Sequence, residues 1–283
     1  MNDLHLRPGE FQAALDFTAA ETGFSARLIE KDYWCSLMLR ELFAEGDLPL
    51  VFKGGTLLSK AYVGFDRLSE DLDFSVPTGP DSARSARSRI AKQIKRKIDS
   101  VAKTLGMEWE EEWKGHNNST QHIGRLSYPT ASGSREAIIV EVGQREPLLA
   151  SSLHVDLRTL LLNPLFSESV LSPIAVTALS RDEAYAEKAR AALTRKEPAI
   201  RDLYDLLQGK RAGLIPLDNR GWIEMVRQKC ADLDLANACS AERLERFRVG
   251  IETDLLPVLR SGAASFDLPE AWEVVEAILA KVR

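Results

Sequence analysis

Cysteine is scarce in this chain of 283 residues, and long apolar runs and an excess of positive charge are missing. Its three cysteines, Cys35, Cys230 and Cys239, are an odd number, and the spacing of the last two matches no zinc or redox motif. We therefore expect reduced packing residues rather than a disulfide framework. No apolar run reaches the roughly 18 residues that a membrane-spanning helix needs, and the N-terminus lacks a signal-peptide pattern. We expect a cytoplasmic protein with no membrane partner.

Basic residues are concentrated in one segment, although the whole chain carries a formal net charge of −5. Between Asp81 and Lys103, eight Arg or Lys residues accompany only two acids, and isoleucines recur at helical spacing. The pattern predicts an amphipathic helix with a basic outer side. That side is either a solvated helix face or a surface that binds a polyanion. For the second reading, the candidate nucleic-acid contacts are Arg84, Arg87, Lys95 and Lys97.

The periodicity predicts an α+β protein, in which mixed helices and strands are followed by helices. Two helices precede the first strand, and no internal repeat is present. We predict strands over residues 48–53, 70–76, 135–144 and 173–180. After these the pattern is helical throughout. The predicted domains are residues 1–178 and 179–283.

The segment FKGGTLLSKAYVGFDRLSEDLDFSV, residues 52–76, combines a glycine turn with two spaced acids. Asp71 and Asp73 lie on one face of a predicted strand, with about 6 to 7 Å between their Cα atoms. Two carboxylates at this separation can bind the same hard cation, and oxygen ligands favour Mg²⁺ or Mn²⁺. Glu141, on another predicted strand, is the candidate third carboxylate.

The glycine turn supplies the other half of the predicted site. Gly54 and Gly55 allow the backbone to approach a phosphate closely, and the helix that we expect Thr56 to cap presents N–H groups to it. Taken singly, such features are usually an ordinary turn, an exposed Asp-x-Asp and a solvated glutamate. In this order they predict a nucleoside triphosphate between a backbone cradle and a metal site. Lys53 is either a nucleotide contact or a strand-end charge.

Three segments resemble the signature sequences of the AbiEii/AbiGii nucleotidyltransferase toxins: IEKDYWCSLMLREL, FKGGTLLSKAYVGFDRLSEDLDFSV and SRDEAYAEKARAALTRKEPAIRDLYDLL. This family is related to the MenT-type toxins and belongs to the DNA polymerase β-like nucleotidyltransferase superfamily. The fold that the resemblance implies is a mixed sheet with flanking helices, followed by a C-terminal helical bundle. The resemblance implies an intracellular toxin, partnered with a DNA-binding antitoxin, that transfers a nucleotide from an NTP. In characterised relatives the acceptor is the 3′ end of tRNA.

The resemblance also assigns roles to residues. It implies nucleotide binding by Gly54, Gly55 and Thr56, and metal binding by Asp71 and Asp73. A later motif falls on Lys188, Asp202 and Asp205. It implies nucleotide binding by Lys188 and Asp202, and a catalytic role for Lys188 and Asp205 beside Asp71 and Asp73. Asp202 and Asp205 share a helix face, and a break at residues 196–198 folds two helices into a hairpin that brings Lys188 toward them. Without the resemblance, an ion pair that joins two helices explains the same residues.

Two other functions remain open from the sequence. The acceptor of the nucleotide could be a small molecule such as an antibiotic, although a small acceptor has no use for the basic helix. Alternatively, the chain could be a regulatory module that binds nucleotide without turnover. The preferred NTP, the tRNA species and the antitoxin have no signature in the sequence.

Overall fold

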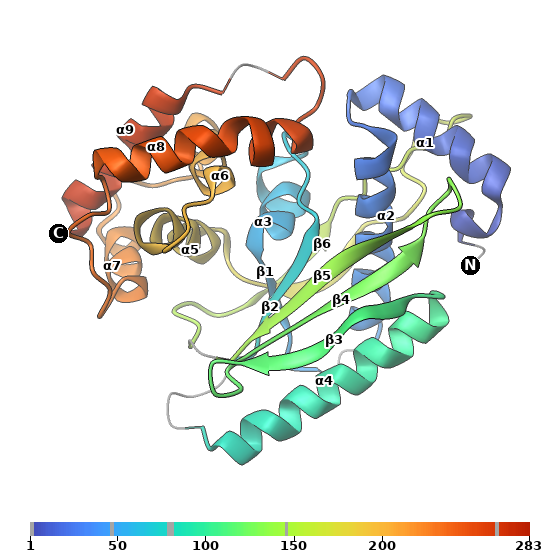
Figure 1. Cartoon of the computed structure of the whole chain (residues 1–283), viewed down its shortest axis with the longest axis horizontal. Helices are drawn as coiled ribbons and strands as arrows, with labels where there is room; N and C mark the ends of the chain where they lie inside the picture. The colour runs from blue at the N-terminus through green and yellow to red at the C-terminus, as the bar shows by residue number, and fades with distance from the viewer. Residues whose placement is uncertain (1–2, 46–47, 78–81, 145–146, 264–265) are drawn as a thin grey trace. The chain divides into compact units, whose positions relative to one another are not determined.

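The computed structural model describes residues 3–45, 48–77, 82–144, 147–263 and 266–283 (Figure 1). The chain divides into two compact units, Met1–Leu179 and Ser180–Arg283. The predicted boundary, between residues 178 and 179, lies one position before this division. Among the described residues, no helix is both long enough and apolar enough to cross a membrane.

Unit 1 is built on a mixed sheet, and the strands found in its described residues follow the order β3-β4-β5-β2-β1-β7-β6. Strand β2 lies between β1, its antiparallel neighbour, and β5, its parallel neighbour. The strand bounds are β1 Val51–Lys53, β2 Asp71–Ser75, β3 Glu108–His116, β4 Gln121–Pro129, β5 Arg135–Gly143, β6 Leu153–Leu157 and β7 Ile174–Ala178.

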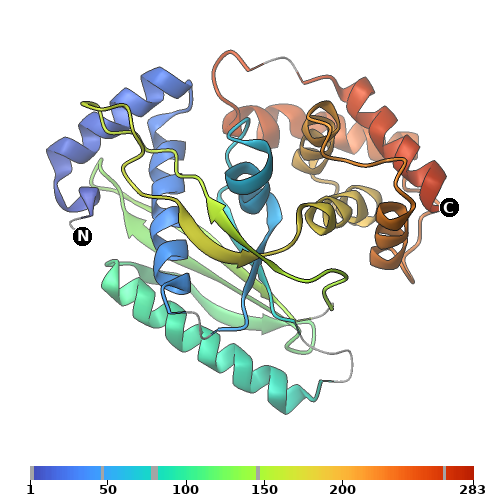
Figure 2. The ribbon, with the colours of Figure 1, turned by 180° about the vertical axis from the view of Figure 1, so that it is seen from behind.

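One face of this sheet is apolar because alternate side chains of each strand point to the same side. On β2 and β5 the buried set is Leu72, Phe74, Ile138, Val140 and Val142. Helices α2 (Ala26–Phe43) and α4 (Arg84–Thr104) cover this face, and α1 (Pro8–Thr22) packs on α2 (Figure 2). The opposite face of β2 carries Asp71 and Asp73.

Strand β1 leads directly into a short helix, α3 (Gly54–Leu57), which continues as a π-helical turn, η2 (Leu58–Val63). Lys60, in the middle of η2, is fully buried and pairs with Asp32 of α2 at 2.6 Å. Its Nζ also donates to the Ser36 hydroxyl at 2.9 Å. Removing one partner of such a buried pair typically costs about 3–5 kcal/mol, so this contact fixes η2 on α2.

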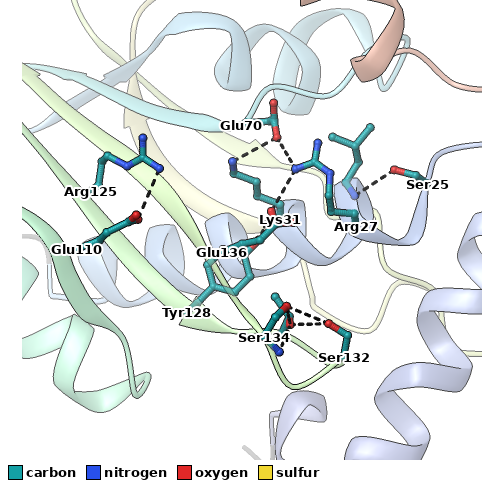
Figure 3. A network of polar contacts seen from close by, with 12 residues as sticks. Ser25, Arg27, Lys31, Glu70, Glu110, Arg125, Tyr128, Ser132, Ser134 and Glu136 are labelled. Carbon is teal, nitrogen blue, oxygen red and sulfur yellow. Dashed lines mark hydrogen bonds and ion pairs between the residues drawn. The ribbon is translucent and has the colours of Figure 1, made fainter.

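A second set of ion pairs joins the first turns of α2 to the sheet (Figure 3). Arg27 lies 3.0 Å from Glu70 and 3.1 Å from Glu136, and Lys31 lies 3.2 Å from Glu70. Burial opposes ionisation of Glu70, but the two cations outweigh it and lower the pKa of this carboxyl. The network holds the segment from which β2 starts.

Unit 2 is helical, with α5 (Arg181–Thr194), α6 (Ile200–Arg211), α7 (Arg220–Lys229), α8 (Ala241–Gly250) and α9 (Leu268–Val282), and short turns η3 (Ile251–Leu255) and η4 (Leu256–Val258). Helices α5 and α6 form the predicted hairpin. Their close approach needs Gly209, because a Cβ there would lie 2.7 Å from the Tyr185 hydroxyl and closer still to its ring. Ser180 caps α5 by accepting from the Glu183 N–H.

The predicted α+β class and the strands at β2, β5 and β7 are confirmed, and the basic segment forms α4. Asp81, at the start of that segment, lies outside the described residues. The predicted first strand is too long, since residues 48–50 lie outside β1. The prediction missed β3, β4 and β6. Cys35 and Cys230 are buried, and all three cysteines are free, as predicted.

Candidate active site

The sheet register brings the predicted carboxylates side by side. Asp73 is the cross-strand partner of Glu141 on β5 and of Lys53 on β1. Partners in register point to the same face, so one row holds a lysine and two acids from three strands. Asp71 lies on the same face two positions earlier, beside Ile139. The sequence placed these acids on strands, and the structure places the strands next to one another.

Gly54 lies against the carboxylate of Asp73. Its φ is +80°, a left-handed conformation that favours glycine. A Cβ at this position would lie 3.0 Å from Asp73 Cγ and closer still to its Oδ2. Any other residue would therefore displace the carboxylate. The glycine turn and the second acid of the motif are in direct contact.

The neighbouring residues of the turn have roles that the sequence did not indicate. A Cβ on Gly55 would lie 2.7 Å from the Arg67 guanidinium and 3.0 Å from the Ser69 hydroxyl. Thr56 is buried, and its hydroxyl donates to the Asp71 carbonyl at 2.6 Å. The prediction that Thr56 caps the helix is wrong, because α3 begins at Gly54 and Lys53 occupies the cap position. Thr56 instead ties α3 to β2.

The donor set fits a hard divalent cation that is shared with a substrate. Among the described residues, no group of three or more His, Cys, Asp or Glu side chains is arranged to hold a metal. Glu141 accepts a hydrogen bond from Gln121 at 2.7 Å, which occupies one of its oxygens. Mg²⁺ usually takes one or two protein carboxylates and completes its shell with water and substrate phosphates. Asp71 and Asp73, with oxygen donors on one face, match that requirement.

Unit 2 holds a separate cluster of the predicted residues. Lys188 Nζ lies 2.7 Å from Asp202 Oδ1 and 2.9 Å from Asp205 Oδ2. The two acids are buried, and the lysine side chain is 13% exposed. Arg195 adds a weaker contact to Asp202 at 3.4 Å. The predicted hairpin thus brings all three together, in a contact that also joins α5 to α6.

A second buried lysine lies in the same unit. Lys229 on α7 contacts Glu183 at 2.8 Å and Glu187 at 3.2 Å, and both its side chain and that of Glu183 are almost completely buried. No spacing in the sequence indicates this pairing, because α7 lies far along the chain from α5. It provides a purely helix-joining cluster with which Lys188 can be compared.

Only part of the predicted nucleic-acid set is available on the surface of α4. Lys95 binds Asp99 at 2.9 Å, Lys97 binds Glu45 at 2.7 Å, and Arg87 donates to the Ser82 carbonyl. Arg84 is exposed. The partners Glu45 and Ser82 lie outside the helix, so the charge pattern of α4 alone did not indicate them.

Comparison with protein families and with solved structures finds similar proteins. The family model described as nucleotidyl transferase AbiEii toxin, type IV toxin–antitoxin system, matches residues 37–274. The fold is similar to that of MenT4, a nucleotidyltransferase toxin from Mycobacterium tuberculosis H37Rv, with a TM-score of 0.58 and 22% identity over 91% of this chain and 83% of MenT4. At that identity the likeness concerns the fold alone. No curated protein matched the chain.

Proposed function

The chain belongs to the AbiEii nucleotidyltransferase toxins of type IV toxin–antitoxin systems, and we propose that it transfers a nucleotide from an NTP to the 3′ end of tRNA. Blocked translation and growth arrest would follow. The observation that carries the proposal is the contact between Gly54 and the Asp73 carboxylate, because it brings the glycine turn directly beside the proposed metal ligand.

In this proposal each residue of the row has a defined task. Asp71 and Asp73 would hold Mg²⁺ or Mn²⁺. Glu141 would bind the same metal or accept a hydrogen bond from a water on it. The metal, when bound, would neutralise phosphate charge and favour ionisation of the acceptor hydroxyl. Gly54 and Gly55 would bring backbone N–H groups to the phosphates. Lys53, beside Asp73 in the register, would offset the charge of the triphosphate.

For Lys188, Asp202 and Asp205 of unit 2, the proposal takes the roles that the family resemblance implies, in nucleotide binding and catalysis. A lysine held between two buried acids has a fixed position, which suits a contact to a phosphate. The 13% exposure of Lys188, against 3% for Lys229, supports a part in binding for the first and a packing role for the second. A cognate DNA-binding antitoxin and a cytoplasmic site of action, where NTPs and tRNA occur, complete the proposal.

The test compares Asp73→Asn with Glu70→Gln. Glu70 lies three positions earlier, but it points to the other face and binds Arg27 and Lys31. We expect Asp73→Asn to remain folded and to lose about 100-fold or more in nucleotide transfer, since loss of a metal ligand removes several kcal/mol of transition-state stabilisation. Glu70→Gln should lose stability and keep its rate per folded molecule.

The measurement is incorporation of each labelled NTP into tRNA with Mg²⁺, Mn²⁺ or EDTA, alongside growth arrest in cells. Transfer that resists EDTA would refute the metal assignment. So would an Asp73→Asn protein that still arrests growth at the parent's level of soluble protein.

A further inference from the structure

The outward side of α4 carries cations that are not neutralised within the described part of the chain. We call Arg89, Lys92 and Arg96 the outer stripe. All three are exposed, and none makes an ion pair with any residue that the structure describes. Lys95 and Lys97, in the same helix, are both paired with acids. Arg84 and Lys103, near the two ends of α4, are exposed as well. In the middle of the helix, the exposed cations that have no acidic partner among the described residues lie along one line of side chains.

The outer stripe has the geometry of an extended anion site. Its members are three and four positions apart, so they lie on one helix face and span about 10 Å along the axis. Together with Ser85, Ser88 and Gln93 they line a shallow hollow whose lining contains no acidic residue. Two of the three cations are arginines, which bind phosphate through paired N–H donors. The stripe thus offers several donors and fixed positive charge to a row of phosphates.

This site lies on the wrong side of the sheet to contact the reacting atoms. Trp109 of β3 binds Asp99 of α4 through its indole N–H at 2.8 Å, and Trp109 is in register with the buried Leu126. Helix α4 therefore covers the apolar face, whereas Asp71 and Asp73 lie on the opposite face. The outer stripe points away from the sheet, so at least one helix diameter, about 10–12 Å, separates it from the sheet.

We propose that the outer stripe anchors the phosphodiester backbone of a folded RNA acceptor at a point remote from its reacting 3′ end. A small acceptor, or a short RNA end alone, cannot reach from the Asp71 and Asp73 face to the far side of α4. A folded tRNA is large enough to contact both. The proposal rests on the proposed function for the class of acceptor, and it assigns contacts to residues other than the predicted Arg87, Lys95 and Lys97.

The experiment uses the full chain and two triple variants with the same change in net charge. One replaces the outer stripe (Arg89→Gln, Lys92→Gln, Arg96→Gln). The other, the paired-cation variant, replaces Lys95 and Lys97, which bind acids, and Arg87, which donates to a backbone carbonyl (Arg87→Gln, Lys95→Gln, Lys97→Gln). Binding of full-length tRNA and of a short acceptor-stem hairpin is measured without NTP over a range of salt concentrations. Transfer to both RNAs is then measured with NTP.

For the outer-stripe variant we expect the salt slope of tRNA binding to fall by about two to three units, because each lost phosphate contact removes about 0.7–0.9. The KM for tRNA should rise, while kcat and all values for the short hairpin stay at those of the parent. The paired-cation variant should retain the parent's slope.

An unchanged slope in the outer-stripe variant would overturn the proposal, and so would equal losses for tRNA and the hairpin. If the outer stripe binds an acidic protein and not RNA, the slope of tRNA binding should be unchanged in the outer-stripe variant. If the parent transfers no nucleotide to any RNA, the proposed function fails. In that case the measurements of tRNA binding without NTP still test whether the outer stripe binds RNA.

Discussion

Replacing Gly54 by alanine perturbs one contact at the centre of the candidate site. The change adds a single methyl group where φ is +80° and where Asp73 Cγ lies 3.0 Å from the new Cβ position. An ordinary contact between carbon and a carboxylate oxygen needs about 3.3 Å. The Asp73 carboxylate, whose Oδ2 lies nearer still, must therefore move by up to about 1 Å.

Two costs can be worked out separately. An alanine in the left-handed region costs about 1–2 kcal/mol of stability, which the lower entropy of the unfolded chain offsets in part. Displacement of a reacting group by about 1 Å can lower a rate by about 100-fold. We therefore expect Gly54→Ala to lose moderate stability and at least 100-fold in transfer per folded molecule.

Gly133→Ala is the matched control. Its φ of +82° is almost the same, and no atom lies within 4 Å of a Cβ built there. It should show the backbone cost alone, with a lower melting temperature and the parent's rate. Thermal unfolding of both variants measures the backbone strain of alanine at positive φ. Nucleotide incorporation measures the effect of displacing the Asp73 carboxylate. If Gly54→Ala matches Gly133→Ala in rate, the contact with Asp73 has no part in transfer and our reasoning is refuted.

Two further predictions concern buried charge. Lys188→Met leaves two buried acids without their lysine, and Lys229→Met leaves the buried Glu183 and the partly buried Glu187. Each variant should lose about 3–5 kcal/mol of stability, but only Lys188→Met should lose transfer per folded molecule. Equal rates in both would show that the Lys188 cluster only joins helices. Burial raises the pKa of Glu30 despite the hydrogen bond that it accepts from the Ala131 N–H. Because its folded pKa exceeds the unfolded value, ionised Glu30 destabilises the native state at neutral pH, and this cost disappears as the pH falls through the folded pKa. In denaturant titrations, Glu30→Gln should thus be at least as stable as the parent at pH 7 and should lose that advantage by about pH 4. An advantage that persists at pH 4 would contradict the raised pKa of Glu30.

The acids of the site could be predicted from the sequence, but their arrangement could not. Alternation along β2 is a local property, so Asp71 and Asp73 could be assigned to one face from spacing alone. The pairing of Asp73 with Glu141 depends on a parallel contact between β2 and β5, which are separated along the chain by α4, β3 and β4. No local pattern specifies which strands become neighbours.

The missed hairpin has a physical explanation as well. In β3, Trp109 and Trp113 are partly buried, but Glu111 between them is exposed, and bulges on both sides of Glu111 interrupt the register with β4. The usual period of two is therefore lost. The turn that follows places Asn117, Asn118 and Ser119 at positive φ. Consecutive asparagines are compatible with such a turn and were the one available signal.

The central position of β2 also determines when the candidate site can exist. Its row of Lys53, Asp73 and Glu141 draws on three strands, one of which is made long after the other two. Contacts between distant segments close late in folding because loop entropy must first be overcome. A nascent chain that has not yet reached β5 therefore lacks the row, so the candidate site cannot form before about half of the 283 residues have been synthesised.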